Sequence, residues 1–470
     1  MTNKLILSSR SKEIIGDTFL SRLSPQDLHT KINEAYLGIL ANDTTLFNPF
    51  EKIPSVAGDK FAEYVTYVMS QPEYFYFIIK YMFGMDSFPQ QCLILKELYT
   101  HKFPLLIGTR GLGKAISVDS PVLTDSGWIK MGDISLKTKV YGRDGKLHNV
   151  TDISPQGRKQ VWLVKFADGR ESECCEDHLW YVRKGTNNFS KEKTISTKDM
   201  YNDKLFFSGS SGKHAFKYKV PNNKPIQYTK KELSVDPYIL GCLLGDGCMT
   251  TLTPKMASDD DFIINEFRNR LSNFSIKRDI SNNNYTIVDS NTKCEKCTCG
   301  SIHRNSLTAK ICRLKLNVDC YNKFIPDEYK TSSIDDRFEI VRGLLDTDGS
   351  INKHGSVEFT NVCERLVDDL IDILRSLGIS CIKSKDNRAG ETHVLPSGKE
   401  TIRKDYFRVY INTNEDVFKL PRKLKRIKKT NSSRRTHTAI VDIQPTNKYT
   451  EMQCISVDSD DNTYIIKDHI

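Results

Sequence analysis

The chain has 470 residues, of which 38% are apolar and 27% charged, and this composition excludes a mostly disordered polymer. Its length is enough for about three domains of 100–200 residues each. No apolar stretch approaches the ~20 residues that span a bilayer, and the first residues lack the apolar core of a secretory signal. We therefore expect neither a membrane protein nor an exported one, and we expect its 13 cysteines to be reduced thiols.

The net charge of +10 is unevenly distributed along the chain. Residues 1–114 contribute +1, and residues 115–470 contribute +9. A basic excess confined to one part suggests a polyanionic partner for that part, most commonly nucleic acid. The alternative is a basic surface that is simply solvated.

The first 114 residues have a helical pattern. A capping box at Ser24–Asp27 and the run 88–99 predict helices, and residues 102–107 predict a short buried strand. That strand leads into Gly108-Thr-Arg-Gly-Leu-Gly113-Lys114, which matches G-x-x-x-x-G-K. Such a loop cradles phosphates with its backbone N–H groups and its lysine. The next residue is Ala115, where a nucleotide-binding loop needs a Ser or Thr hydroxyl for Mg²⁺.

The pattern changes directly after Lys114. Short alternating runs such as 161–166 predict strands, and Asp125-Ser-Gly127 and Arg143-Asp-Gly145 predict the turns between them. A phosphate-binding loop is followed by a helix, which this pattern does not predict. From the pattern alone, a chance match to the phosphate-loop motif stays open.

An internal repeat is visible in the second half. Gly241-Cys-Leu-Leu-Gly-Asp246-Gly and Gly343-Leu-Leu-Asp-Thr-Asp348-Gly share G-x-L-x-x-D-G, and their aspartates lie 102 residues apart. Each motif follows apolar residues at helical spacing, beginning near Asp236 and near Asp336. Glycine inside a helix is unfavourable by about 1 kcal/mol, so its recurrence predicts two backbones in close contact. Each helix is expected to end at its Asp-Gly pair.

Two further features are less specific. Cys294, Cys297 and Cys299, with His303 nearby, are candidate zinc ligands, and the alternative is a cluster of reduced cysteines in a loop. An apolar stripe from Leu366 to Leu377 predicts a helix that Gly378 ends.

Residues 115–470 resemble an intein that carries a LAGLIDADG homing endonuclease, and residues 1–114 resemble the start of a phage large terminase, the DNA-packaging ATPase. The intein motifs are the opening segment 115–124, Cys175-Glu-Asp-His178 and the closing segment 451–458. The resemblance implies a multidomain chain: a helical or partly α/β segment (1–114), an all-β splicing domain of the Hint type (115–225 and 421–470) and an α+β endonuclease with a pseudo-twofold repeat (226–420).

Most inteins begin with a nucleophilic Cys or Ser, but Ala115 has no nucleophile. The chain is similar to a minority class with Trp two residues after the motif His and Cys in the closing segment, here Trp180 and Cys454. The resemblance implies that Cys454 attacks the carbonyl of Lys114, that His178 protonates the departing nitrogen of Ala115, and that Trp180 positions Cys454. Taken singly, a cysteine near a chain end is more often a small buried hydrophobe. Cys174 and Cys175 are expected to be structural.

The end of the sequence departs from the family pattern. Inteins close with His-Asn, whose Asn releases the intein, whereas this sequence ends at Lys467-Asp-His-Ile470, about four residues earlier. His469 aligns with a bulky apolar position rather than with the catalytic histidine. The resemblance implies that this chain can at most cleave its N-terminal junction, because ligation needs the C-terminal intein tail and a downstream host segment. Either the reading frame is truncated or these parts are encoded separately.

The endonuclease resemblance implies that Asp246 and Asp348 meet and hold Mg²⁺ against the two scissile phosphates of double-stranded DNA, the intein-less host gene being the homing target. A single chain with both repeats acts as a monomer. Lys323 is a candidate catalytic lysine, and the run 421–436, with eight basic residues and no acidic one, is expected to contact phosphates or to be solvated.

Two rival functions remain. One is a DNA-binding remnant that has lost both activities. The other is an ATP-driven packaging motor, which would bind ATP and Mg²⁺ at Gly108, Gly113 and Lys114 only after excision. The expected location is the cytoplasm of an infected bacterial host.

Overall fold

The computed structural model describes residues 115–185, 191–208, 214–279, 283–290, 295–296, 302–386, 390–394, 400–402, 405–430 and 435–470. The chain divides into two compact units, residues 1–108 and 109–470, and everything below concerns the second. The helices predicted in residues 1–114, the phosphate loop, Lys114 and the cysteines 294, 297 and 299 lie outside the described residues.

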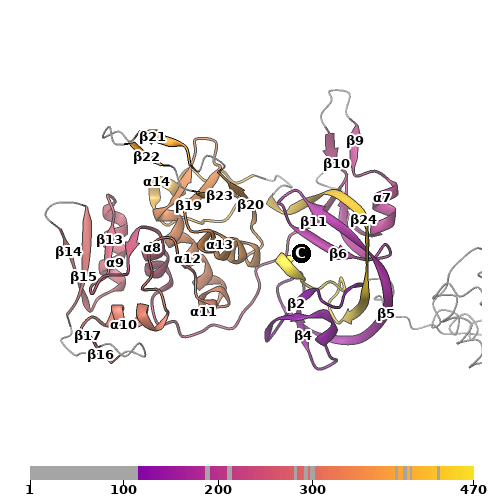
Figure 1. Ribbon diagram of the computed structural model, residues 1–470, viewed down its shortest axis with the longest axis horizontal. Helices are drawn as coiled ribbons and strands as arrows, with labels where there is room; N and C mark the ends of the chain where they lie inside the picture. Colours follow the sequence, from indigo (N-terminus) through magenta and orange to yellow (C-terminus); the bar gives the residue numbers. More distant parts are fainter. Residues whose placement is uncertain are drawn as a thin grey trace, which may run out of the picture. The chain divides into compact units, whose positions relative to one another are not determined.

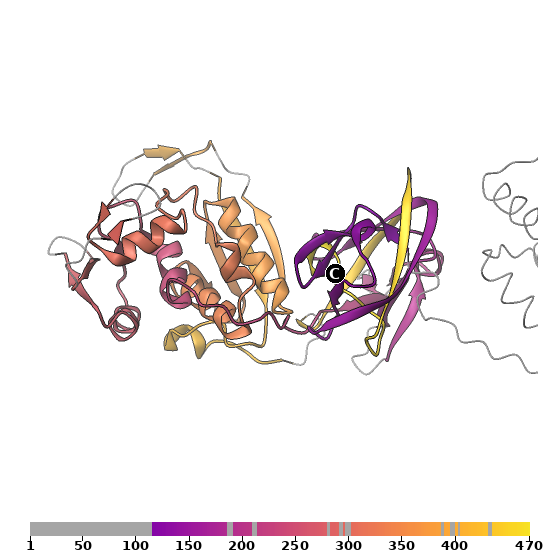
Figure 2. The ribbon, with the colours of Figure 1, turned by 90° about the horizontal axis from the view of Figure 1, so that it is seen from below.

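Two very long strands, β5 (Leu147–Phe166) and β24 (His437–Val457), organise a ten-stranded sheet. They run antiparallel, with pairs extending from Ile440–Phe166 to Val457–Val150, and both ribbon views show them side by side (Figures 1 and 2). Bulges shift the register at four points, which lets the sheet curve around its core. The sheet order is β3-β2-β4-β5-β6-β1-β24-β11-β7-β8. The other eight strands are β1 (Ile116–Ser117), β2 (Pro121–Thr124), β3 (Gly127–Lys130), β4 (Lys139–Tyr141), β6 (Glu171–Cys174), β7 (Leu179–Lys184), β8 (Glu192–Ser196) and β11 (Tyr218–Pro221).

The predicted alternation and turns of this sheet are present. Along β5, Val164 and Phe166 point into the core while their neighbours are less buried. Gly127 and Gly145 both have positive φ, 99° and 79°, as the tight turns at these points require. The strands predicted after Lys114 are therefore present, together with the short helix α7 (Thr197–Asn202), which an all-β region was not expected to contain; the boundary at Lys114 stays a prediction.

The two repeated motifs form a helix pair. Helix α8 (Pro237–Asp246) begins at the cap residue Asp236, and α12 (Ile334–Thr347) begins at the cap residue Ser333. A Cβ added at Gly241 would lie 3.0 Å from the Cα of Gly343, so the two backbones touch at the paired glycines. The predicted close contact is confirmed.

Glycine caps α8 at Gly247 and follows the cap residue Asp348 of α12 at Gly349, but its role differs from the expected one. Gly247 has an extended conformation, with φ −85° and ψ 148°, rather than the left-handed conformation of a common glycine stop. A Cβ there would lie 2.5 Å from the Cα and the carbonyl oxygen of Leu243, and one at Gly349 would lie 2.7 Å from the Cα of Leu345. The chain turns back so closely on the helix end that only glycine fits.

The repeat extends beyond the helices. Two four-stranded sheets have the spatial orders β12-β13-β15-β14 and β18-β19-β23-β20. In both sheets, the strand that comes fourth along the chain lies between the second and the third. The first half contains β12 (Gly247–Cys248), β13 (Lys255–Ala257), α9 (Asp261–Arg270), β14 (Phe274–Arg278) and β15 (Asn284–Asp289). The second contains β18 (Gly349–Ile351), β19 (Val357–Asn361), α13 (Glu364–Ser376), β20 (Ser380–Lys385) and β23 (Phe407–Asn412). This duplicated topology agrees with the predicted pseudo-twofold repeat.

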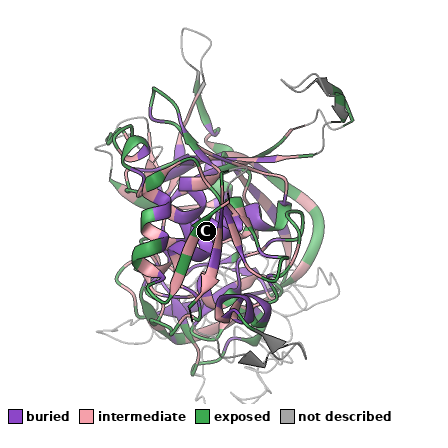
Figure 3. Ribbon diagram, turned by 90° about the vertical axis from the view of Figure 1, so that its left-hand side faces the viewer, coloured by how far each residue is buried: buried purple, intermediate pink, exposed green. Residues whose placement is uncertain are grey.

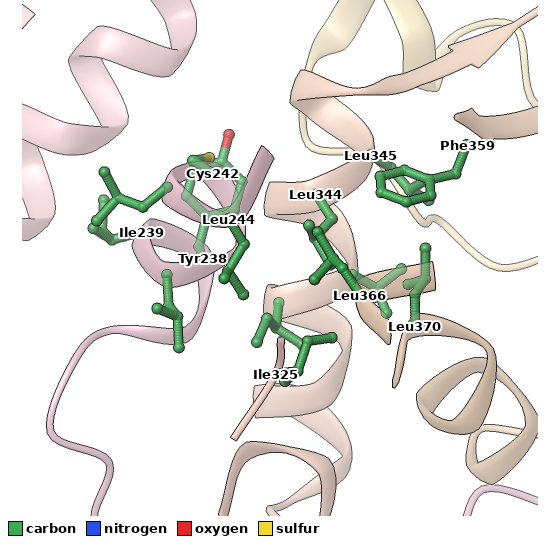
Figure 4. Packing of buried hydrophobic residues seen from close by; sticks show 14 of the residues in the cluster. Tyr238, Ile239, Cys242, Leu244, Ile325, Leu344, Leu345, Phe359, Leu366 and Leu370 are labelled. Carbon is green, nitrogen blue, oxygen red and sulfur yellow. The ribbon is translucent and has the colours of Figure 1, made fainter. Parts of the chain in front are cut away.

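One apolar core fills the duplicated region. Leu244, Leu344 and Leu366 meet in it from α8, α12 and α13 (Figure 4). Helix α13 has the predicted stripe, and Gly378 with φ +74° follows its end. Buried and exposed residues lie on opposite sides of such elements (Figure 3). In the described part of the chain, no helix is long and apolar enough to cross a membrane.

The remaining elements are short. They are η4 (Met131–Asp133), α7 (Thr197–Asn202), β9 (Phe206–Ser208), β10 (His214–Phe216), β16 (Glu295–Lys296), β17 (Ile302–His303), α10 (Ser306–Arg313), α11 (Asp327–Lys330), β21 (Thr392–Val394), β22 (Glu400–Ile402), α14 (Pro421–Leu424) and η6 (Lys467–His469). His303 ends β17, but its cysteine partners are outside the described residues, so the zinc site stays a prediction.

Candidate active sites

Two aspartates occupy equivalent positions where the paired helices end. Asp246 is the last residue of α8, and Asp348 is the C-cap residue of α12. Burial raises the pKa of both carboxyl groups, and the charge of Asp246 helps to raise the pKa of Asp348 to about 6. Asn361 Nδ2 donates a hydrogen bond of 2.8 Å to Asp348 Oδ2. The carboxylates are therefore close enough to repel each other, while their role as metal ligands stays a prediction.

The donor set suits a hard divalent cation. In the described ranges, no group of three or more His, Cys, Asp or Glu side chains is arranged to hold a metal ion. Mg²⁺ does not need such a group, because it usually binds through one or two carboxylates together with waters and substrate phosphates. A cation would also relieve the repulsion that raises the pKa of Asp348. Asp246 and Asp348 therefore fit a cation that is shared with a phosphate.

Lys323 reaches the end of α8 from the segment that precedes α11. Its Nζ donates hydrogen bonds of 2.9 Å to the carbonyl oxygens of Leu244, Gly245 and Gly247. The side chain is buried, and burial lowers the pKa of its ammonium group while Asp348 and Asp246 oppose that shift. The cation thus caps carbonyls that the helix leaves unpaired and lies in the field of both aspartates.

Lys423, which the sequence analysis did not single out, caps the carbonyls at the end of α12 in the same way. Its Nζ donates to the carbonyl oxygens of Leu345 (2.8 Å), Asp346 (2.7 Å) and Gly349 (2.7 Å). Burial lowers its pKa to about 8. The available signal was the repeat itself, because Lys323 follows its aspartate by 77 residues and Lys423 follows its own by 75.

The contacts of Lys423 also bear on the basic run 421–436. Helix α14, the first part of this run, contacts the end of α12 through this buried lysine. These residues therefore pack with the duplicated region, although a boundary at residue 421 was expected. Contact of the remaining basic residues with phosphates stays a prediction.

A second candidate site lies where β1 meets β24. The antiparallel register pairs Ile116 with Gln453 and Ser117 with Met452. Continuing that register by one residue brings Ala115 opposite Cys454, although the two are far apart in the sequence. Both are almost completely buried, with 0% and 1% of their surfaces exposed. The candidate nucleophile therefore lies beside the first residue of the all-β region.

The motif Cys175–His178 borders the same point. The N–H of Cys175 donates to the carbonyl of Ala115 at 3.2 Å, and the N–H of His178 donates to the carbonyl of Cys175 at 3.2 Å. Cys175 packs in a small buried cluster with Ala115, and burial raises the pKa of its thiol. The structural role expected for Cys175 stays a prediction.

Trp180 contacts the histidine. Their ring centroids are 4.9 Å apart in an edge-on arrangement. Trp180 Nε1 donates to Thr197 Oγ1 at 3.0 Å, and Thr197 donates through its N–H (3.0 Å) and its hydroxyl (3.2 Å) to the carbonyl of His178. Thr197, which the sequence reasoning missed, thus joins the two. Packing of Trp180 against Cys454 stays a prediction.

Tyr464 is a further residue that the sequence did not single out. Its hydroxyl is buried and has no hydrogen-bond partner among the described residues. Burial raises its pKa, and Cys454 and Cys175 add to that shift. Tyr464 also lines a pocket together with His178, Trp180, residues 462–466 and residues 469–470. His469 forms part of the wall, and its Nε2 is 3.0 Å from Asp372 Oδ1.

One part of the duplicated region matches a known protein family, and a longer part of the chain is similar to a known protein. Residues 335–425 match the LAGLIDADG-like domain family. The chain is 24% identical over 373 residues to the replicative DNA helicase DnaB of Mycobacterium intracellulare. That alignment covers 76% of this chain, which spans 57% of the relative's length.

The solved structures that are similar to this chain include an intein and the homing endonuclease I-DmoI. The MchDnaB-1 intein is 22% identical, with 18% of this chain and 60% of that one covered and a TM-score of 0.16. I-DmoI in complex with DNA and Mn is 10% identical, with 38% and 89% covered and a TM-score of 0.23.

Proposed function

We propose that residues 115–470 form a self-splicing intein that carries a LAGLIDADG-type homing endonuclease. The observation that carries the endonuclease proposal is the contact between the two glycine-bearing helices, which brings Asp246 and Asp348 to equivalent helix ends. The match of residues 335–425 to the LAGLIDADG-like domain family includes the second of these helices. The observation that carries the splicing proposal is the β1–β24 register, which brings Ala115 opposite Cys454.

The endonuclease acts through two equivalent half-sites. Each half supplies one aspartate, which would hold Mg²⁺, and one lysine, Lys323 or Lys423, which neutralises the carbonyls at the adjacent helix end. A bound divalent cation activates water and stabilises the leaving oxygen. The lysines add positive charge where negative charge develops on the phosphate. Two half-sites in one chain suit the two strands of a duplex, so the substrate is double-stranded DNA and the enzyme acts as a monomer.

A plasmid cleavage assay tests this activity. The substrate is DNA that joins the codons for residues 1–114 directly to downstream host codons, without the intein, incubated with the full chain and Mg²⁺. We expect a double-strand break that Asp246→Asn and Asp348→Asn each reduce by at least 100-fold. Asp335→Asn, at an exposed position in the first turn of α12, is the matched control. The rival DNA-binding remnant predicts retention of the plasmid without any break.

Splicing begins at the junction between Lys114 and Ala115. The Cys454 sulfur, as thiolate, attacks the carbonyl carbon of Lys114, a thioester bond forms, and the peptide bond to Ala115 breaks. His178 gives a proton to the departing nitrogen, a role that imidazole side chains commonly perform. Thr197 and Trp180 hold the backbone and ring of His178 in place. Cys454 is buried, and a sulfur that is already positioned beside the junction attacks more readily.

Mass spectrometry of the purified chain tests the nucleophile. We expect scission between Lys114 and Ala115, accelerated by an added thiol that releases the thioester, and we expect Cys454→Ala to abolish it. Cys175→Ala removes a neighbouring buried thiol and should slow scission only modestly. Undiminished scission in Cys454→Ala would show that another group attacks.

The proposed host is a phage terminase large subunit. Its support is the sequence motif at Gly108, Gly113 and Lys114, which would regain a Ser or Thr hydroxyl when splicing joins Lys114 to the host residue that follows the intein. Before splicing, the chain should not bind Mg-ATP tightly, and ATP-driven packaging would belong to the spliced product alone. Tight Mg-ATP binding by the intact chain, measured by calorimetry, would favour the packaging motor instead.

A further inference from the structure

The segment 465–470 has an unusual conformation. Its first residues are tied to the sheet, because the N–H of Leu123 donates to the carbonyl of Ile465 and the N–H of Ile465 to that of Tyr141, both at 2.9 Å. Asp468 and His469 then have positive φ values of 61° and 58°. Left-handed conformations at residues other than glycine cost about 1 kcal/mol or more each, so other contacts must hold this turn.

Arg170 supplies such contacts. Its Nη1 donates to the carbonyl oxygens of Asp468 (3.2 Å) and His469 (2.9 Å), the two residues with positive φ. Its Nε donates to Asp168 Oδ2 at 2.9 Å, and its Nη2 donates to Thr438 Oγ1 at 3.0 Å. Only 9% of the Arg170 side chain is exposed. All three guanidinium nitrogens are therefore bonded, and the terminal carbonyls receive two of these bonds.

The turn that carries Arg170 is itself fixed. It joins β5 to β6, and Gly169 has φ +84°. Asp168 Oδ1 accepts a hydrogen bond of 3.2 Å from the N–H of Arg170, while its other oxygen binds the guanidinium. This carboxylate therefore orients both the backbone and the side chain of Arg170. A lysine cannot reproduce this fork of donors.

The segment held by Arg170 forms a wall of the pocket that contains His178, Trp180 and Tyr464. We propose that Arg170 is a positioning residue of the splicing centre, which holds the main chain of residues 468–469 so that this wall stays closed around His178. The inference rests on the proposed splicing function. Arg170 acts through its hydrogen bonds to the carbonyls of Asp468 and His469.

A second set of contacts reaches the same two residues through their side chains. Arg375 Nη1 is 3.1 Å from Asp468 Oδ1, and Asp372 Oδ1 is 3.0 Å from His469 Nε2. These contacts come from α13, whereas Arg170 holds only the main chain. A change at residue 170 therefore removes the backbone contacts while the side-chain contacts remain available, so the turn should loosen without complete loss of structure.

The experiment compares Arg170→Met and Arg170→Lys in the full chain. Arg183→Met is the matched control, because Arg183 is also a sheet arginine, paired with Glu192 at 2.7 Å, and does not contact the terminal segment. Hydrogen exchange reports on the amides of residues 466–470, and mass spectrometry gives the rate of scission at Lys114 over pH 5.5–8.5. A structural role alone would change the exchange and leave the pH profile of scission as it is.

We expect Arg170→Met to speed hydrogen exchange at residues 466–470 at least tenfold and to slow scission at least tenfold. We also expect it to displace the midpoint of the pH profile of scission, because His178 becomes more hydrated when the pocket wall loosens. Arg170→Lys should recover part of the rate, and Arg183→Met should match the unsubstituted chain. Unchanged exchange, or faster exchange with an unchanged scission profile, overturns the inference. If the unsubstituted chain shows no scission, the proposed splicing fails and with it a positioning role in splicing.

Discussion

Replacement of Gly343 by alanine tests the contact on which the endonuclease site depends. A Cβ at residue 343 would lie 2.8 Å from the backbone N of Cys242 and 2.9 Å from the Cα of Gly241, and it would also meet the carbonyl of Tyr238. These are backbone atoms of α8 and cannot rotate away. The carbonyl oxygen of Tyr238 is the nearest of these atoms, and to bring it to a normal contact of about 3.4 Å the helices must separate by about 1 Å.

The expected magnitude follows from two opposing effects. Alanine in a helix interior is favoured over glycine by about 1 kcal/mol. Overpacking a well-filled interface costs about 1–3 kcal/mol and occasionally more, and obstruction by backbone places this case at or above the upper end. We therefore expect a net destabilisation of about 2 kcal/mol. For a region of about 200 residues this lowers the melting temperature by roughly 4–8 °C.

Calorimetry of the full chain measures this change, and plasmid cleavage then reports whether separation of Asp246 and Asp348 also lowers activity. Gly245→Ala provides the matched comparison, because a Cβ there meets the side chain of Thr347, with its Cβ at 2.8 Å. Adding Thr347→Gly should recover part of the stability lost in Gly245→Ala. A Gly343→Ala protein that melts at or above the original temperature would refute close backbone contact.

The remaining predictions concern buried charge. Lys423→Met should slow plasmid cleavage by about 10²–10⁴-fold, as expected when a positioned group that assists the reaction is removed, whereas Lys425→Met at an exposed position should not. Because the pKa of Asp348 is raised to about 6, its proton competes with Mg²⁺ below that pH, so calorimetric Mg²⁺ affinity should fall about tenfold per pH unit from pH 6 to 5 and change little from 7 to 8. Arg337→Met should lower the free energy of unfolding in urea by about 2–4 kcal/mol, because this fully buried guanidinium donates to the carbonyls of Ser332 and Ile226, which would lose their partner.

The sequence predicted those features of the fold that depend on local pattern. The helix pair, the contact of Gly241 with Gly343 and the strands after Ala115 were predicted, because glycine recurrence and alternation are visible within a short window. The predicted role of Gly247 as a common glycine helix stop was wrong, since this glycine is needed for close approach to Leu243 and not for a positive φ. Such an approach depends on where the following strand goes, which no local pattern contains.

The candidate sites were predictable to a smaller extent. Lys423 lies in a run of exposed basic residues, and nothing in that run distinguishes the one lysine that is buried at the end of α12. Thr197 and Tyr464 carry no motif, and their importance comes from neighbours such as His178 and Cys454, which are distant in sequence. Polar residues whose role depends on long-range strand register are therefore the ones that sequence reasoning misses.

The charges around the two helix ends explain why the lysines are buried there. Each helix C-terminus carries roughly −0.5 charge, so two such ends with two ionised aspartates amount to about −3, against +2 from Lys323 and Lys423. By bonding the carbonyls, the lysines neutralise the helix ends and leave the charge of Asp246 and Asp348 for a cation. Removing a lysine should therefore strengthen divalent cation binding while cleavage slows. That opposite change of binding and rate separates an electrostatic role from simple loss of the fold, which would weaken both.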